Sequence, residues 1–366
     1  MSIGQSFTAS LRSSAGALLR EARLHAAGLR PRTAGPTALV MPSQGRDDGA
    51  ANLRGFCIAD YLNAHGWNAF VCPKHLGLSQ RRRIIRTIRP DVILMQSARL
   101  AENRPQNFPG IPVVFDIDDA DYLAENSRGA VDEALRGSVA VIAGSRTVAE
   151  YCRAQNGDVT IVWTGSPPSP GTPRPQEQRQ RIVTWAASGP LTYPQEASFV
   201  VDVLRQAVGL TAPFRFMLFA DDGSAAYDAL VARFAETGVE VLRRPYMSYP
   251  DYLDTLEEAA VGLAPLVALD GFSSGKSFGK VLAYLDRGVP VVTHPVVDHP
   301  LFFRDGENGF MVKSASEWAD RLVGLLDDAN ARQRLSDAGR ADFVSRLSTA
   351  EAGRRVEAVL SRSVGK

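Results

Sequence analysis

Residues 270–293, which read DGFSSGKSFGKVLAYLDRGVPVVT, indicate the fold of this chain most directly. The segment starts with glycines and serines and continues into a helix-like stretch with apolar residues at positions i, i+3, i+4 and i+7. These apolar residues are Phe278, Val281, Leu282 and Leu285. Gly288 is suited to end the helix, and the apolar run at 289–292 is typical of a strand buried in a parallel sheet. A loop, a helix and a buried strand in this order predict an α/β protein.

The loop before this helix has the composition of an anion site. A small-residue loop that leads into a helix N-terminus leaves backbone N–H groups directed at whatever lies in front of it. Lys276 and Lys280 lie one turn apart and add two positive charges. We therefore expect both lysines to contact a phosphate, beside backbone N–H groups of Ser277, Phe278 and Gly279. The alternative is two ordinary surface lysines at the start of a helix that Ser277 caps.

The composition fits a globular two-domain protein. The 366 residues are enough for two domains, and the net charge of +1 gives no general attraction to nucleic acid. No apolar run reaches the roughly 20 residues of a membrane span, and the N-terminus lacks the apolar core of a signal peptide. Cys57, Cys72 and Cys152 have neither metal-binding nor disulfide spacing, so we expect a cytoplasmic protein with reduced thiols.

Two segments are rich in arginine. Residues 1–34 carry five arginines with leucines between them, and a second cluster comprises Arg81, Arg82, Arg83, Arg86 and Arg89. The first segment is either a basic amphipathic helix lying on an anionic membrane or a mobile tail. The second is either a contact to anionic lipid or an anionic acceptor, or a solvated helix face. A peripheral position at the inner face of a membrane therefore stays open.

Strand-like and helix-like segments alternate along the chain, which predicts βαβ units with helices on both faces of a parallel sheet. The first six predicted strands are 37–41, 68–72, 91–95, 112–116, 139–143 and 159–162. The run TGSPPSPGTPRPQEQRQ at 164–180 has five prolines and no apolar periodicity, so it indicates a linker. Six more strands are predicted at 181–185, 214–220, 239–242, 261–264, 289–293 and 310–312. Helices are expected at 49–65, 146–154, 278–287, 318–327, 331–343 and 350–362.

We therefore predict two Rossmann-like, doubly wound domains that face a cleft. The predicted parts are a basic tail (1–34), an N-terminal domain (35–165), a proline-rich linker (166–180), a C-terminal domain (181–345) and a final helix that packs back on the N-terminal domain (346–366). Ligands of such sheets bind beyond the carboxyl ends of the strands. The loops at 42–49 and 265–278 lie at those ends.

Several motifs in the second half point to one family. They are YPDYL at 249–253, VGLAPL at 261–266, Phe272 with GKS at 275–277 and Lys280, GVPVV at 288–292, and FRDGENGF at 303–310. With these motifs the chain resembles the retaining nucleotide-sugar glycosyltransferases of the GT-B fold, the group called family 4, in the form found among polysaccharide and O-antigen enzymes. The resemblance is good from 249 to 343 and weaker from 38 to 184.

The resemblance implies an enzyme that moves a hexose from a UDP- or GDP-sugar to a glycan, lipid-linked or other surface acceptor, with retention and without a bound metal or other cofactor. The departing diphosphate would be neutralised by helix N-terminal amides and basic side chains, here the amides at 275–279, which include Gly275, and the side chains of Lys276 and Lys280. The acceptor hydroxyl attacks from the face of the leaving group, so no protein nucleophile is required. Closure over the linker would exclude water.

The resemblance also implies roles for residues at other strand ends. Gly49 begins a helix beside a loop that approaches donor and acceptor in the resembling enzymes; the alternative is a simple cap by Asp47 or Asp48. Gly189 lies where those enzymes bind donor phosphates, although this chain has no basic residue between 185 and 200. Arg243 and Arg244 lie where the nucleobase is received.

Acidic residues end the fourth predicted strand. Asp116, Asp118 and Asp119 lie close together there, and such clusters can bind a divalent metal. We expect Asp118 to contact an acceptor hydroxyl or to cap a helix instead. The five histidines have no metal-ligand spacing, and His294 and His299 are only weak candidates for a site.

Two positions depart from the family pattern. The resembling enzymes carry two glutamates with seven residues between them, and the second binds the ribose of the nucleotide. Gly275 and Ala283 stand at these positions. Loss of the ribose partner would weaken donor binding by about 1–3 kcal/mol. Two alternatives follow: a degenerate glycosyltransferase fold that binds a glycan or partner without turnover, and a transferase with an unusual acceptor such as modified nucleic acid or protein.

Overall fold

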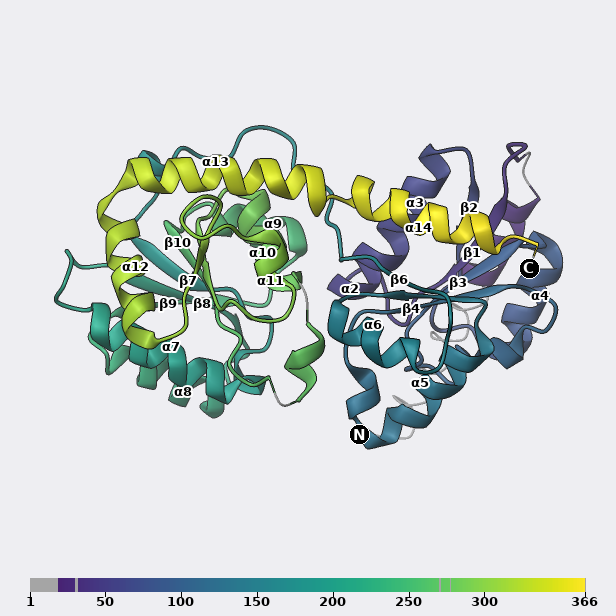
Figure 1. Ribbon diagram of the computed structural model, residues 1–366, viewed down its shortest axis with the longest axis horizontal. Coiled ribbons are helices and arrows are strands. Elements are labelled where there is room, and N and C mark those ends of the chain that lie inside the picture. Colours follow the sequence, from purple (N-terminus) through teal and green to yellow (C-terminus); the bar gives the residue numbers. More distant parts are fainter. Residues whose placement is uncertain (1–18, 30–31, 270, 277, 366) are drawn as a thin grey trace. The chain divides into compact units, whose positions relative to one another are not determined.

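Two six-stranded parallel sheets form the framework of the chain (Figure 1). The computed structural model describes residues 19–29, 32–269, 271–276 and 278–365, without the side chains of Phe272, Ser273 and Lys280. It divides the chain into two units. The first unit extends to Gly165 and also includes Thr349–Lys366, and the second is Ser166–Ser348.

The first sheet has the strand order β2-β1-β3-β4-β5-β6. Its strands are β1 (Thr37–Met41), β2 (Asn68–Val71), β3 (Val92–Gln96), β4 (Val113–Ile117), β5 (Ala140–Ala143) and β6 (Val159–Ile161). Every neighbouring pair is parallel. The chain leaves β1 toward β2 and returns to the other side of β1 with β3, so the order reverses between β1 and β3.

Helices cover both faces of this sheet. They are α2 (Gly49–Ala51), the π-helical turn η1 (Asn52–Phe56), α3 (Cys57–Ala64), α4 (Leu78–Ile88), α5 (Glu125–Gly137), α6 (Arg146–Arg153) and α14 (Thr349–Ser363), with short 3₁₀ turns η2 (Pro105–Asn107) and η3 (Asp121–Leu123). α3 and α14 share one core with the sheet, and α4, α5 and α6 share another. α14, drawn in yellow, lies beside α3 in Figure 1. The predicted helix at 49–65 is therefore present but contains a π-helical turn.

The second sheet has the order β12-β11-β10-β7-β8-β9. Its strands are β7 (Ile182–Trp185), β8 (Arg215–Asp221), β9 (Glu240–Pro245), β10 (Val261–Ala264), β11 (Val291–Thr293) and β12 (Phe310–Met311). Its helices are α7 (Pro194–Ala207), α8 (Ala225–Ala235), α9 (Tyr249–Leu256), α10 (Gly279–Asp286), α11 (His299–Phe302), α12 (Ala315–Asp327) and α13 (Ala329–Arg346), with 3₁₀ turns η4 (Gln176–Gln178), η5 (Pro190–Thr192) and η6 (Phe272–Gly275). The strand order reverses between β7 and β10. All twelve predicted strands are present, and the α/β prediction is confirmed.

Tyr284 fixes α10 against the carboxyl ends of two strands. Its buried hydroxyl accepts a hydrogen bond from the Ala186 N–H at 2.7 Å and lies 3.2 Å from the carbonyl oxygens of Thr184 and Leu263. A Cβ atom on Gly262 would come within 2.9 Å of the Tyr284 ring, so the small residue in β10 makes room for it. The start of α10 is thereby held at the edge where β7 and β10 end.

The proline-rich segment 166–180 is part of the second unit and packs on other segments of it. The buried Gln176 side chain donates a 2.6 Å hydrogen bond to the Gly288 carbonyl, and Arg179 donates to the carbonyls of Ala259 and Arg287. The Ser169 N–H donates to Asp286. The segment lacks an apolar pattern because hydrogen bonds of polar side chains, and not apolar contacts, hold it in place.

The two arginine-rich segments contact each other. Residues 19–28 form a helix, and its buried Glu21 pairs with Arg83 of α4 at 2.8 Å. The described part of the expected tail is therefore a packed helix; residues 1–18, 30 and 31 lie outside the described residues. Arg81 corrects the expected surface cluster. It is fully buried and donates to Asn103 and to the Leu76 carbonyl, whereas Arg82, Arg83, Arg86 and Arg89 are exposed.

In the part of the chain that the structure describes, every helix is too short or too polar to cross a bilayer.

Candidate functional site

Lys276 and Tyr193 meet at the edge of the second sheet. Lys276 follows β10 and η6, and Tyr193 follows β7 and η5. The Lys276 Nζ atom lies 2.5 Å from the Tyr193 hydroxyl and 4.2 Å from the centre of the ring. Because the strand order reverses between β7 and β10, this is the place where open parallel sheets bind ligands.

A hollow of about 420 Å³ adjoins this contact. It is lined by Thr192, Tyr193, Pro194, Gln195, Glu196, Ala268 and Gly271. The Glu196 carboxylate is buried and accepts hydrogen bonds from the Val267 and Ala268 N–H groups, which holds the loop after β10 in place. Small-molecule pockets commonly measure about 300–1,000 Å³, so the hollow has room for a ligand.

Lys276 supplies the loop after β7 with the charge that the loop lacks. The Gly189 carbonyl accepts hydrogen bonds from the Thr192 N–H and hydroxyl, which forms the tight turn of η5. No basic residue occurs between 185 and 200, but Lys276 brings an ammonium group to Tyr193. The structure thus brings Gly189 and Lys276 to the same edge.

The remaining residues of the predicted anion loop divide into three groups. Phe278 is buried at the N-cap of α10, where it stacks on His299 with ring centres 5.5 Å apart and contacts the tilted ring of Phe302 at 5.4 Å. Gly279 is exposed as the first residue of α10, and Gly275 is buried at the end of η6. Ser277 and the side chains of Phe272 and Lys280 lie outside the described residues.

The two positions of the missing glutamates carry no acidic group. Ala283 is 3% exposed and packs in the interior, and Gly275 is buried. Neither position can therefore offer a carboxylate to a ribose.

Arg243 and Arg244 both have acidic partners. Arg243 pairs with Asp221 at 2.7 Å and with Asp228 at 2.9 Å, and these bonds raise its pKa. Arg244 pairs with Glu258 at 3.1 Å. Contact of either arginine with a nucleobase stays a prediction.

The histidines at the end of β11 have structural partners. His294 accepts a hydrogen bond from the Leu266 N–H, and its burial lowers its pKa. His299 is buried and lies 2.8 Å from the Thr293 hydroxyl.

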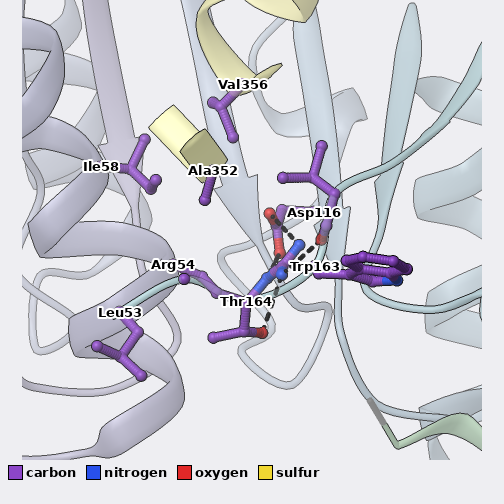
Figure 2. Close-up of a pocket in the computed structure, with 10 residues that line it drawn as sticks. Leu53, Arg54, Ile58, Asp116, Trp163, Thr164, Ala352 and Val356 are labelled. Carbon is purple, nitrogen blue, oxygen red and sulfur yellow. Dashed lines mark hydrogen bonds and ion pairs between the residues drawn. The ribbon is translucent and has the colours of Figure 1, made fainter. Parts of the chain in front are cut away.

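In the first unit, a buried arginine meets the acids at the end of β4. Figure 2 shows Arg54 directed at Asp116 and Thr164. Arg54 Nε and Nη2 donate to the two carboxylate oxygens of Asp116 at 2.8 and 2.9 Å. Arg54 Nη1 donates to the Val162 carbonyl at 2.9 Å and to the Thr164 hydroxyl at 3.1 Å. Arg54 was not among the predicted site residues. Its place between Leu53 and Phe56 in an apolar helical stretch is the signal that could have identified it.

A second arginine holds the acids that follow. Arg99 donates to Asp119 at 2.9 Å and to Asp121 at 2.7 Å. The Ser97 hydroxyl also lies within hydrogen-bonding distance of Asp121. Asp119 and Asp121 are therefore both neutralised by one guanidinium.

Asp118 differs from its neighbours. It is half-buried, and the structure gives its carboxylate no hydrogen bond and no ion pair with any described residue. Burial and the charge of Asp119 raise its pKa to about 7, while the Arg54 guanidinium opposes that rise. Asp118 is therefore a carboxyl group that can exchange a proton near neutral pH.

Gly49 begins α2 and is exposed, and the Asp48 side chain accepts a hydrogen bond from the Ala51 N–H. Asp48 thus caps the helix, as the simpler interpretation expects. Within the described ranges, no three His, Cys, Asp or Glu side chains gather in a way that could hold a metal ion.

One family model matches part of the chain. Residues 183–328 match the family described as Glycosyl transferases group 1, a range that includes Tyr193, Lys276 and α10. No curated protein has a matching sequence.

Several solved structures have a similar fold at low sequence identity. A glycosyltransferase from Rickettsia africae has a TM-score of 0.69 at 10% identity, over 91% of this chain and 100% of that one. HepE from Anabaena, in complex with UDP and glucose, has a TM-score of 0.61 at 16% identity, over 89% and 100%. A TarM variant from S. aureus, in complex with fondaparinux, α-GlcNAc-glycerol and UDP, has a TM-score of 0.57 at 13% identity, over 78% and 58%. This chain thus spans little more than half the length of TarM.

The chain has a GT-B-like fold. The matched range 183–328 lies within the second unit of this fold. In the GT-B-like fold of this chain, the Lys276–Tyr193 contact belongs to the matched second unit and the Asp118 group to the first.

Proposed function

We propose that the protein transfers a hexose from a nucleotide diphosphate sugar to a hydroxyl of a glycan, lipid-linked or other surface acceptor. The observation that carries this proposal is the Lys276 ammonium group held on Tyr193 beside a hollow of about 420 Å³, at the strand reversal of the second sheet. A cation held on Tyr193, which lines a hollow of this size, suits a diphosphate, the part that UDP- and GDP-sugars share.

In the proposed reaction, negative charge grows on the diphosphate as the bond to the sugar breaks. Lys276 neutralises this charge, and Lys280 and the amides at 277–279 assist it in place of a metal ion. The acceptor attacks from the face that the diphosphate leaves, so the configuration of the sugar is retained and no protein nucleophile takes part.

Asp118 has the acid–base properties that an acceptor hydroxyl needs. Its pKa of about 7 lets it both accept and release a proton at neutral pH. We assign Asp118 to the acceptor side of the reaction, in the first unit, and the donor to the second unit.

The donor assignment is tested by calorimetric titration with UDP and GDP. Lys276→Met removes a charge-assisted hydrogen bond worth about 1.5–3 kcal/mol, so we expect Kd to rise roughly 10- to 100-fold. Lys313→Met, an exposed lysine of the same unit, is the matched control and should bind like the wild type. Nucleotide binding that Lys276→Met leaves unchanged would refute the donor site.

A second function is favoured by Gly275 and the buried Ala283, which leave the ribose without a carboxylate partner. A chain that has lost donor binding would be a glycan- or partner-binding protein. Release of UDP or GDP from a panel of nucleotide sugars separates the two functions. Turnover supports the transferase, and glycan binding without nucleotide binding supports the alternative.

We also propose that the first unit rests on an anionic membrane surface. α4 has four arginines and no acidic residue, and Arg82 and Arg86 are exposed one turn apart. The adjoining helix at 19–28 exposes Arg23 and Leu19, and Leu29 follows at 79% exposure. Its single acid, Glu21, is buried against Arg83 and so does not offset these charges. Exposed arginine and leucine together suit an anionic lipid surface.

Co-sedimentation with vesicles tests this contact. Wild-type protein should bind vesicles containing phosphatidylglycerol and not pure phosphatidylcholine vesicles. The triple variant Arg23→Gln, Arg82→Gln and Arg86→Gln should lose this binding. A triple variant with the same charge change at exposed Arg174, Arg233 and Arg334 of the second unit should keep it. Equal loss in both variants would indicate a general charge effect and refute the surface.

A further inference from the structure

Arg54 lies where both connections between the units leave the first unit. Val162 and Thr164, which it contacts, precede the end of the first unit's main segment at Gly165. Ala352 and Val356 of α14, where the chain re-enters this unit, line the same small cavity as Arg54 and Asp116 (Figure 2). That cavity measures about 10 Å³, room for at most one water molecule, so the arginine has no ligand pocket of its own.

Arg54 and Asp116 form a buried ion pair with a fixed geometry. The guanidinium is 4% exposed and the carboxylate 1%. Two parallel hydrogen bonds fix their mutual orientation, and the remaining bonds hold the backbone at Val162. Arg54 projects from the π-helical turn η1, a feature that often marks functional positions.

The Arg54–Asp116 ion pair fixes the backbone immediately before Asp118. Asp116 is in β4, which ends at Ile117, and Asp118 is the first residue after this strand. From the other side, a Cβ atom at Gly144 would come within 2.7 Å of the Asp118 Cα atom, so the chain after β5 packs tightly against it. The position of the Asp118 side chain is therefore set by the contacts of its backbone and not by hydrogen bonds of its carboxylate to described residues.

We propose that Arg54 is a positioning residue for Asp118: it fixes the end of β4 through Asp116 and places a positive charge close enough to favour the ionised form of Asp118. The inference rests on the proposed function, because Asp118 serves catalysis only if the chain transfers a sugar. The effect of Arg54 on the pKa of Asp118 can, however, be tested without any substrate.

The charges around Asp118 determine whether a substitution raises or lowers its pKa. Asp116 and Asp119 are negative and disfavour its ionised form, whereas Arg54 and Arg99 are positive and favour it. Asp121 is held by Arg99 on the far side of Asp119. Removing the positive charge of Arg54 therefore raises the pKa of Asp118, and removing the negative charge of Asp116 lowers it.

The experiment is a ¹³C NMR titration of full-length protein labelled at the aspartate carboxyl carbons, with the Asp118 signal assigned from Asp118→Asn. We expect Arg54→Met to raise the apparent pKa of Asp118 and Asp116→Asn to lower it. The double variant Arg54→Met with Asp116→Asn removes one charge of each sign and should titrate near the wild type. It also avoids leaving an unpaired buried charge, so it guards against loss of the fold.

Arg54→Lys keeps the charge but loses the two-pronged geometry, so its pKa should stay close to that of the wild type while the acceptor KM rises. The acid limb of the kcat/KM profile should follow the NMR values in every variant. The proposal is overturned if the single variants lower Tm but leave the titration of Asp118 unchanged. If the NMR shifts occur and no sugar transfer is found with any donor, the proposed function fails and the coupling stands.

Discussion

Asp118 lowers the free energy of unfolding at neutral pH, and this effect can be measured without a ligand. An unfolded aspartate has a pKa of about 4, whereas that of folded Asp118 is raised to about 7. Between these values the unfolded chain releases a proton that the folded chain keeps, so stability falls as pH rises, and the full cost is present above pH 7. We expect Asp118→Asn to raise Tm over the wild type by an amount that is small near pH 4 and grows to pH 8.

Asp222 provides a control of opposite sign. It accepts hydrogen bonds from Ser224, which lower its pKa. Its contribution to stability is therefore present at neutral pH and lost as pH falls through the folded pKa. Asp222→Asn should lower Tm at neutral pH and have less effect in acid. Thermal scans of both variants from about pH 2 to pH 8 should diverge, because the effect of Asp222→Asn declines only below about pH 4, and a parallel trend would contradict the assignment to Asp118.

Single residues also mark how far the sequence could predict the site. Small residues before a helix correctly indicated that Lys276 lies at the sheet edge, because that inference needs only the order of loop, helix and strand. Its contact with Tyr193 joins residues 83 positions apart, and no local pattern specifies it. The prediction that Arg81 lies on the surface was wrong. Arg81 shares a helix face with Ile84 and Ile88, and this spacing indicates that its side chain is buried.

Two glycines in helices test how closely α14 docks on α3. A Cβ atom on Gly353 of α14 would come within 2.4 Å of the Tyr61 ring of α3, which itself stacks on His65. Gly353→Ala should therefore destabilise the first unit by about 1–3 kcal/mol through overpacking. Gly324 of α12 is exposed, and a Cβ atom there would meet no other atom within 4 Å, so Gly324→Ala should instead stabilise by about 0.5–1 kcal/mol.

Urea unfolding of the two variants and the wild type measures both effects. If Gly353→Ala stabilises the protein as Gly324→Ala does, helix propensity and not the α3–α14 contact governs the result.

Elements were predicted well where burial determines the sequence. Strands covered on both faces must be apolar along most of their length, so fully buried strands such as β1, β3 and β10 appeared as short apolar runs. The π-helical turn η1 left no such mark. The residues on both sides of the turn have helical backbone angles, and the turn carries Arg54, which bonds Asp116 far away in sequence.

On a larger scale, chain order and spatial order differ in the first unit. α14 belongs to this unit although the entire second unit separates it from β6 in sequence. Its buried Val356, Val359 and Leu360 share a core with Val40, Leu94 and Val114 of the sheet. Glu357 adds polar contacts, since it accepts hydrogen bonds from Trp67 at 3.1 Å and from Tyr61 at 3.4 Å. Amphipathicity alone predicts a helix at 350–362 but not the sheet that it covers.

Deleting residues 349–366 should therefore unfold the first unit and spare the second. Burial of each large aliphatic side chain contributes about 1.5–3 kcal/mol, and three of them together approach the about 5–15 kcal/mol that stabilises a whole domain. Hydrogen exchange should become fast in β1, β3 and β4 and stay slow in β7, β8 and β10. Val356→Ser with Leu360→Ser keeps the chain length and should produce the same pattern more weakly. Protection retained in β1 and β3 of the deletion variant would show that the first sheet is stable without α14.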